Sequence, residues 1–153
     1  MNNIKEIDYR GVLKFKIPSS WVEEYDDKHG GTFYEDSPLS GTLRLQLMTL
    51  KTPKDSFFKD AKSILDDIIE KGPESILLPN DNALKMFFEQ SVDSGHEITI
   101  YYWSLVQFLK PNQVRLGNFS YTVLTNRLGI EYVREEIDFL NKEIKNATFS
   151  IKS

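Results

Sequence analysis

The chain of 153 residues contains no cysteine and only two histidines. Without a thiol it can form neither a disulfide nor a thiolate metal site, and it has no cysteine nucleophile. The phosphate-binding loop, the dinucleotide fingerprint, the Gly-x-Ser-x-Gly elbow and the His-Glu-x-x-His helix are all missing from the sequence as well. We therefore predict no bound cofactor and no metal, and a non-enzymatic role is favoured over catalysis.

Positive charge is also scarce. The 19 Lys and Arg residues are outnumbered by 23 Asp and Glu residues, which gives a formal charge of −4. Nucleic-acid binding requires a basic surface that neutralises phosphates, so no nucleic acid is expected as a partner. The first residues include Glu6 and Asp8 and hold no long apolar run. This pattern predicts no signal peptide and no membrane insertion, and thus a cytoplasmic protein.

What the chain does contain fits one folded domain. Hydrophobic residues make up 40% of it and charged residues 27%, as in ordinary soluble proteins. We see no internal repeat, linker or low-complexity segment. The expected unit is therefore a single α+β domain that spans residues 1–153.

The first third of the chain has the pattern of short strands. Residues 12–17 alternate between apolar and lysine side chains, and Pro18 ends the strand because it has no N–H to donate. A second extended piece starts at Trp21, and two more strands are expected at 32–35 and 42–50. Turn residues separate these pieces, so we predict an antiparallel meander.

Two segments have the pattern of amphipathic helices. In residues 52–73, Thr52 is placed to be the N-cap, Pro53 occupies the first helical position, and Gly72 with Pro73 gives the stop. In residues 129–147, apolar side chains recur every three or four positions.

Three long strands are expected between these helices, at 83–92, 96–109 and 114–124. The middle strand is apolar on both faces, which is typical of a central strand that is covered on both sides. The fold class is therefore α+β: an antiparallel sheet of about six to seven strands flanked by two helices. One helix on each face is the preferred arrangement, although both could lie on one side.

Two polar segments are candidate sites. Asp93-Ser94-Gly95 resembles the aspartic-protease signature, but its polar neighbours and its place between two strands indicate a hairpin turn. The acidic segment 23–36 around His29 could hold a hard cation or attract a basic partner, although it lacks the spacing of a calcium-binding loop. The alternative is that these acidic side chains are simply hydrated at the surface and bind nothing.

A sheet face of mixed polarity is the candidate groove. If both turns between the long strands are tight, Tyr102 lies opposite Tyr121 on an apolar face. The other face then carries the groove residues, which are Tyr101, Trp103, Asn118, Ser120 and Thr122. A slip of one residue would exchange the two faces, and core packing is the alternative role for these aromatic residues.

The strand Phe15–Ile17, followed by Pro18 and Trp21, and the order of the elements resemble the PsbP-like superfamily. That group includes the photosystem PsbP proteins, DcrB-like bacterial proteins and Eag-type secretion chaperones. The resemblance implies an antiparallel sheet flanked by helices and a binding or chaperone role, and it supplies no catalytic residues.

We therefore expect a non-enzymatic module that binds a protein or peptide partner, as a chaperone or adaptor, and that could form a homodimer. The alternative is a small-molecule-binding protein, or an enzyme without a known motif, that uses the aromatic face.

Overall fold

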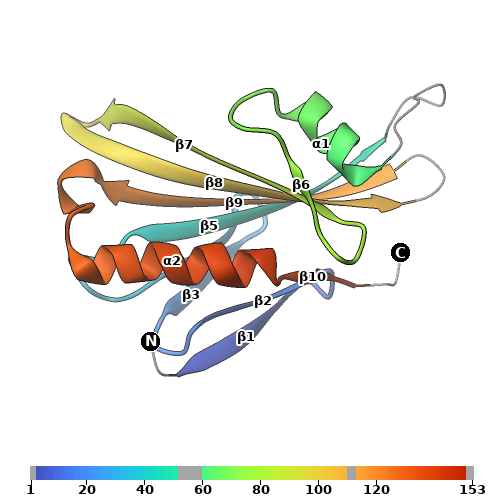
Figure 1. Cartoon of the computed structure of the whole chain (residues 1–153). Helices are drawn as coiled ribbons and strands as arrows, with labels where there is room; N and C mark the ends of the chain where they lie inside the picture. Colours follow the sequence, from blue (N-terminus) through green and yellow to red (C-terminus); the bar gives the residue numbers. More distant parts are fainter. Residues whose placement is uncertain (1–2, 52–59, 110–112, 151–153) are drawn as a thin grey trace.

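The computed structural model describes residues 3–51, 60–109 and 113–150. Within these ranges the chain forms ten strands, two α-helices and one 3₁₀ helix (Figure 1). In chain order they are β1 (Ile4–Tyr9), β2 (Leu13–Pro18), β3 (Val22–Asp26), β4 (Gly30–Tyr34), β5 (Thr42–Lys51), α1 (Ala61–Ile68), β6 (Ile76–Leu77), β7 (Ala83–Asp93), β8 (His96–Leu109), β9 (Gln113–Leu124), η1 (Thr125–Arg127), α2 (Glu131–Lys145) and β10 (Thr148–Phe149).

The strands form two sheets. Seven of them make a large sheet in the order β3-β4-β5-β9-β8-β7-β6, and every neighbouring pair is antiparallel. The other three make a small sheet in the order β1-β2-β10. The predicted α+β class with a sheet of six to seven strands is therefore confirmed, and the small sheet is an addition.

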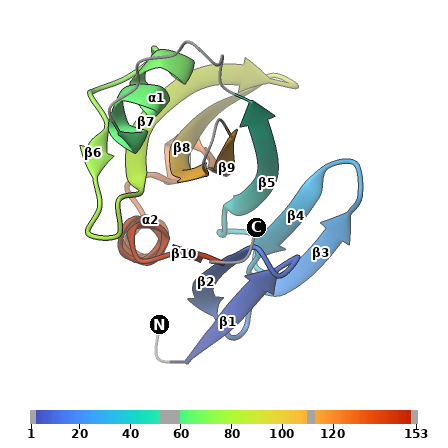
Figure 2. The same cartoon turned by 90° about the vertical axis from the view of Figure 1, so that its right-hand side faces the viewer.

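The two helices lie on opposite faces of the large sheet (Figure 2). The buried side chains of α2 pack on one face with Trp103, Phe119 and Tyr121. The buried side chains of α1 pack on the other face with Val106 and Leu116. The preferred arrangement of one helix per face is correct, because each amphipathic helix buries its own apolar stripe on a separate face.

The predicted meander in the first third is wrong at its first step. Strand β2 pairs with β1 and β10 rather than with β3. Its apolar side chains cover the same face of the large sheet as α2, where the ring of Phe15 meets that of Phe119 at 5.1 Å between centroids. The alternation in β2 correctly predicts which side chains are buried, but it does not say with which strand β2 pairs.

Helix α1 is shorter than predicted. Asp60 is its N-cap, with extended backbone (φ −160°, ψ 175°) and a side chain that accepts a hydrogen bond from the Ser63 N–H. A continuous helix from Pro53 is therefore wrong, while Thr52 and Pro53 themselves lie outside the described residues. The helix also ends at Ile68, before the predicted stop at Gly72.

The Asp-Ser-Gly sequence forms the β7–β8 hairpin turn, as predicted. Ser94 and Gly95 both have positive φ, 52° and 82°. This is the backbone shape that a tight two-residue hairpin requires, since it matches the twist of the two strands.

Candidate functional site

The register between β8 and β9 decides which side chains share a face. Tyr101 lies opposite Tyr121, and Tyr102 lies opposite Ser120. The predicted register is therefore wrong by one residue. Strand β8 ends at Leu109 and β9 starts at Gln113, so three residues join them where a tight turn would have two. The extra residue moves every pair by one position.

This shift divides the predicted groove between two faces. Tyr101 and Trp103 lie on the face that α2 covers, and Trp103 is 1% exposed. Its indole N–H donates a hydrogen bond to Asn141 of α2 at 2.9 Å. Asn118, Ser120 and Thr122 lie on the opposite face. The prediction that these five side chains line one groove is wrong, and Trp103 belongs to the core.

The face that carries Asn118 and Ser120 has two rows of side chains that run across the sheet. The strand registers place the first row as Thr32, Arg44, Ser120, Tyr102 and Phe87, from five adjacent strands. The second row is Gln46, Asn118, Ser104 and Lys85.

All residues of these rows except the buried Lys85 form the floor of a groove of about 520 Å³. His29, in the β3–β4 turn, and Ile69, just after α1, also line the groove. Because the five strands of the first row are separated by four spacings of about 4.8 Å, the floor is roughly 19 Å long. Helix α1 packs over Val106 and Leu116, farther along the same face.

The groove lining contains two ionisable basic side chains and no carboxylate. Arg44 is exposed and makes no ion pair with any residue that the structure describes. His29 is already engaged, because its Nδ1 lies 2.9 Å from an oxygen of Asp26. Arg44 is therefore the basic group best placed to meet an anionic ligand.

One end of the first row is aromatic. The rings of Phe87 and Tyr102 stack with their centroids 4.7 Å apart and 19° between their planes. Burial is the main cause that raises the pKa of Tyr102, and the charge of Glu89 adds to it. The phenol is consequently neutral at physiological pH and can donate or accept a hydrogen bond.

The wall near α1 is held by an ion pair. Lys85 is 3% exposed, and its ammonium lies 3.3 Å from Asp66 and donates to the Ile69 carbonyl at 2.5 Å. Hydrogen bonds from Ser75 are the main cause that lowers the pKa of Asp66. The carboxylate is therefore ionised and fastens α1 to β7.

Sequence reasoning missed Arg44, Gln46, Tyr102 and Phe87 as groove residues. A signal was present in β5, where Arg44 and Gln46 alternate with leucines. This pattern predicts a strand with one solvent-exposed face. Which side chains of the neighbouring strands lie beside Arg44 and Gln46 follows only from the strand registers.

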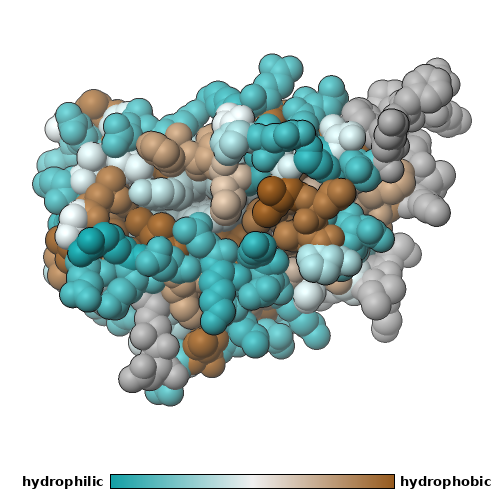
Figure 3. All heavy atoms as spheres, viewed as in Figure 1, coloured by the Kyte–Doolittle hydropathy of each residue, from teal (hydrophilic) through white to brown (hydrophobic). Residues whose placement is uncertain are grey.

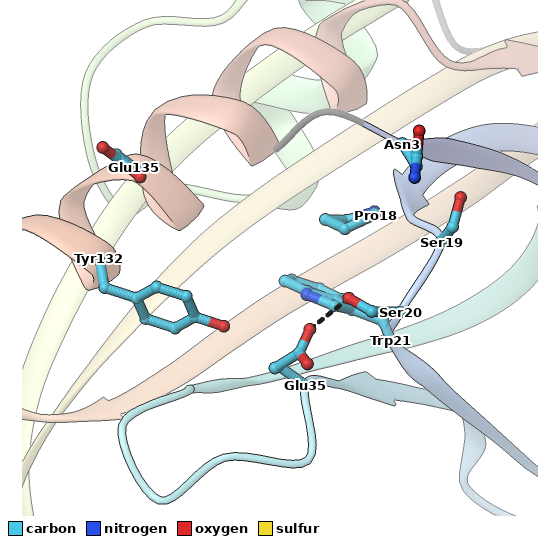
Figure 4. A pocket seen from close by; sticks show the side chains of 8 residues that line it. All are labelled: Asn3, Pro18, Ser19, Ser20, Trp21, Glu35, Tyr132 and Glu135. Atoms are coloured by element: carbon cyan, nitrogen blue, oxygen red, sulfur yellow. Dashed lines mark hydrogen bonds between the residues drawn. The ribbon is translucent and has the colours of Figure 1, made fainter.

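A second cavity, of about 680 Å³, lies between the end of β2 and the start of α2 (Figure 4). The segment Pro18–Trp21 lines it together with Glu35, Tyr132, Glu135 and Asn3. Ser20 donates a hydrogen bond to Glu35 at 2.5 Å. The Pro18 and Trp21 motif thus borders a cavity, although Trp21 itself is 2% exposed and packs in the core.

Behind this cavity α2 buries an acidic side chain. Glu136 is fully buried and accepts hydrogen bonds from the Tyr121 hydroxyl, the Ser40 hydroxyl and the Gly41 N–H. Burial raises the pKa of Glu136, and the bonds from Tyr121 and Ser40 oppose that rise. The cluster joins α2, β9 and the segment before β5.

The acidic turn has separate partners for its carboxylates. Asp26 accepts from the Lys28 N–H and contacts His29, and Glu23 contacts Lys5 at 2.7 Å. Among the residues that the structure describes, no three His, Asp or Glu side chains are placed to share a metal ion.

No family model and no curated protein matches the sequence. Solved structures do share its fold. A crystal structure from Bacteroides thetaiotaomicron aligns with a TM-score of 0.62 at 18% identity over 99% of this chain, which spans half of that longer chain. Mycobacterium tuberculosis LpqN, a protein involved in cell envelope biogenesis, aligns with a TM-score of 0.62 at 12% identity over 97% of this chain and 92% of LpqN.

A solution structure of the cyanobacterial PsbP (CyanoP) from Synechocystis sp. PCC 6803 also matches. Its TM-score is 0.46 at 9% identity, over 98% of this chain and 94% of CyanoP. At these identities the similarity concerns the fold alone. Among the described helices, neither has the length and apolar composition to span a membrane.

Proposed function

We propose that this chain is a non-enzymatic binding module whose groove on the α1 face takes an extended, acidic segment of a protein partner. The observation that carries the proposal is the cross-strand row Thr32, Arg44, Ser120, Tyr102 and Phe87. It combines a basic side chain that makes no ion pair with a described residue, neutral hydrogen-bonding groups and an aromatic end on one continuous floor.

The dimensions of the groove support a peptide of moderate length. A floor of roughly 19 Å accommodates about six extended residues, since each residue advances by about 3.3 Å. The polar side chains of the second row, such as Asn118 and Gln46, can hydrogen-bond to the backbone of such a segment. Arg44 can form a bidentate pair with one carboxylate of the segment, and Phe87 with Tyr102 can contact an apolar side chain.

A small organic anion is the second candidate. A groove of about 520 Å³ is within the usual size of small-molecule sites. The stacked rings next to polar groups would suit a ligand with one apolar part and one carboxylate. In this case the same Arg44 would hold the carboxylate.

A binding assay with two probes separates the candidates. The first probe is a fluorescein-labelled hexapeptide of alternating Phe and Glu, followed by fluorescence anisotropy, and the second is 3-phenylpropionate, followed by calorimetry. We expect the peptide to bind and Arg44→Met to weaken it by about tenfold, because a charge-assisted hydrogen bond is lost. Lys16→Met, which removes an exposed charge from the small sheet, is the matched control.

Peptide binding that is equal in wild type and Arg44→Met would contradict the proposal. Binding of 3-phenylpropionate without peptide binding would favour the small-molecule candidate. No binding of either probe, with the chain folded by circular dichroism, would count against the groove as a site.

We also propose a place in the PsbP-like superfamily and in the cytoplasm. The order of elements and the strand Phe15–Ile17 followed by Pro18 and Trp21 support the superfamily, in which chaperone and adaptor roles occur. The lack of cysteine fits a reducing compartment and is the observation that supports this location. Fractionation of the native host followed by immunoblotting tests the compartment, and recovery in the membrane or secreted fraction would contradict it.

A further inference from the structure

Within the described ranges of the chain, strand β7 leaves most of its outer edge without a partner strand. It has eleven residues, but β6 pairs only with Ala83 and Leu84. Figure 1 shows β6 at one end of β7, while the other end runs into the hairpin with β8 with no described strand beside it. An edge strand directs the N–H and C=O groups of alternate residues outward, where another strand can pair with them.

Two large apolar side chains on this edge are exposed to solvent. Phe88 is 62% exposed and Val92 is 68% exposed, and both point to the face that also carries α2. Figure 3 shows hydrophobic residues gathered over β6 and β7 on this face. The ring of Phe88 rests beside Tyr101, with centroids 5.9 Å apart, so it is held in place. Natural edges are usually protected by inward-pointing charges, proline or bulges, and the stretch Phe88–Val92 contains no proline.

From these observations we propose that a second copy of this chain pairs with β7 in antiparallel register about a two-fold axis at Gln90. The interface joins two seven-stranded sheets edge to edge. It is separate from the groove, and it holds whether or not the groove binds a peptide.

The charges along the strand select this register. The segment around Gly72 lies close to Phe87, so pairing is confined to the stretch from Phe88 to the hairpin. A two-fold axis at position 89 would place Glu89 opposite its own copy. An axis at position 91 would place Glu89 opposite Asp93 of the second copy. Glu89 already pairs with Lys71 of its own chain at 2.6 Å, which offsets part of its charge but supplies no cation to the carboxylate placed opposite it. Like charges directly opposite each other destabilise a strand pair.

An axis at Gln90 has neither conflict. It places Phe88 opposite Val92 of the second copy, and by symmetry Val92 opposite Phe88. Glu89 then faces Ser91, and Gln90 faces its own copy, with which its amide can hydrogen-bond. Aromatic and β-branched residues are favourable cross-strand partners, so the two equivalent pairs supply an apolar centre to the interface.

The absence of cysteine makes a direct test possible. Single-cysteine variants Gln90→Cys, Glu89→Cys and Ser91→Cys are oxidised under identical mild conditions and resolved on non-reducing gels. Directly opposed residues of an antiparallel pair lie within disulfide range, so Gln90→Cys should form a covalent dimer fastest. Equal rates in all three variants, or faster cross-linking at 89 or 91, would overturn the proposed register.

Sedimentation velocity of the unmodified chain tests the dimer itself. We expect a reversible dimer whose Kd rises about tenfold or more in Phe88→Lys, because two cross-strand pairs are lost. Met48→Lys changes an equally apolar exposed residue of β5 and should leave the Kd unchanged. A monomer at every soluble concentration of wild type would overturn the proposal. Circular dichroism shows whether each variant is folded, and the cross-linking test does not depend on Phe88→Lys.

Discussion

The buried carboxyl of Glu136 gives a sharp test of the described packing. In Glu136→Ala, the Ser40 hydroxyl keeps the Gly41 carbonyl as an acceptor at 2.9 Å. The Gly41 N–H keeps the Tyr121 oxygen at 3.2 Å. The buried Tyr121 hydroxyl loses its acceptor, and the partly exposed Tyr132 loses its hydrogen bond to Glu136 but can bond to water instead. An orphaned buried donor costs about 1–3 kcal/mol, and removal of a buried acid offsets part of the lost packing. We expect the free energy of unfolding to fall by about 2 kcal/mol.

The pH dependence has a definite sign. Burial raises the pKa of Glu136 in the folded state above its ordinary value of 4.5. Above pH 4.5 the unfolded chain therefore releases this proton while the folded chain still holds it. Its contribution lowers the free energy of unfolding as the pH rises from 4.5 through the folded pKa. Glu136→Gln, which has nearly the same shape and does not titrate, should lose this contribution.

Urea unfolding followed by tryptophan fluorescence measures both effects, because Trp21 and Trp103 are both buried. Tyr121→Phe serves as the partner variant in a double-mutant cycle, in which we expect a coupling of about 1 kcal/mol or more. A stability of Glu136→Ala equal to wild type, or a pH profile of Glu136→Gln that matches wild type above pH 4.5, would refute the reasoning.

Three further predictions concern the rest of the fold. Asp66→Asn should lower the free energy of unfolding by about 3 kcal/mol, because Lys85 stays buried without its carboxylate. Because the folded chain lowers the pKa of Asp66, its carboxylate stabilises the fold above the ordinary pKa of 3.8, and this stabilisation is lost as the pH falls. In urea unfolding, Asp66→Asn should therefore lose less stability in acid than wild type does. Trp103→Phe should lower the melting temperature through the lost bond to Asn141, while peptide affinity stays unchanged because Trp103 lies on the other face; a loss of affinity in the folded variant would contradict the face assignment. Gly95→Ala should cost about 1 kcal/mol in urea unfolding, since its φ of 82° suits glycine, and no change would argue against this turn.

Local patterns were enough to locate most of the elements. The alternation in 12–17 and the three long strands predicted β2, β7, β8 and β9 within a few residues, and the 3.6 period predicted α2. Strand β1 and the two-residue β10 were not expected. β10 has too few residues to show a period, and it exists because it pairs with Lys14 and Leu13 of β2.

The groove shows where prediction from the sequence stopped. Asn118 and Ser120 were correctly expected on a sheet face of mixed polarity, and both line the groove. Their aromatic neighbour is Tyr102 rather than Tyr101, because the connection between β8 and β9 has three residues. A connection of three residues instead of two shifts the register by one residue, and this shift places Tyr101 on the α2 face and Tyr102 on the groove face.

By itself, the sequence determined the features that depend on near neighbours along the chain. These are the strand and helix periods, the tight turn at Ser94-Gly95 and the two apolar faces of β8. Only the tertiary structure showed which strands pair and in which register. The burial of Glu136 and the exposed edge of β7 also follow from it alone. The physical reason is that a period of two orders side chains within a strand, whereas alignment between strands depends on loop closure and packing between residues far apart in the chain.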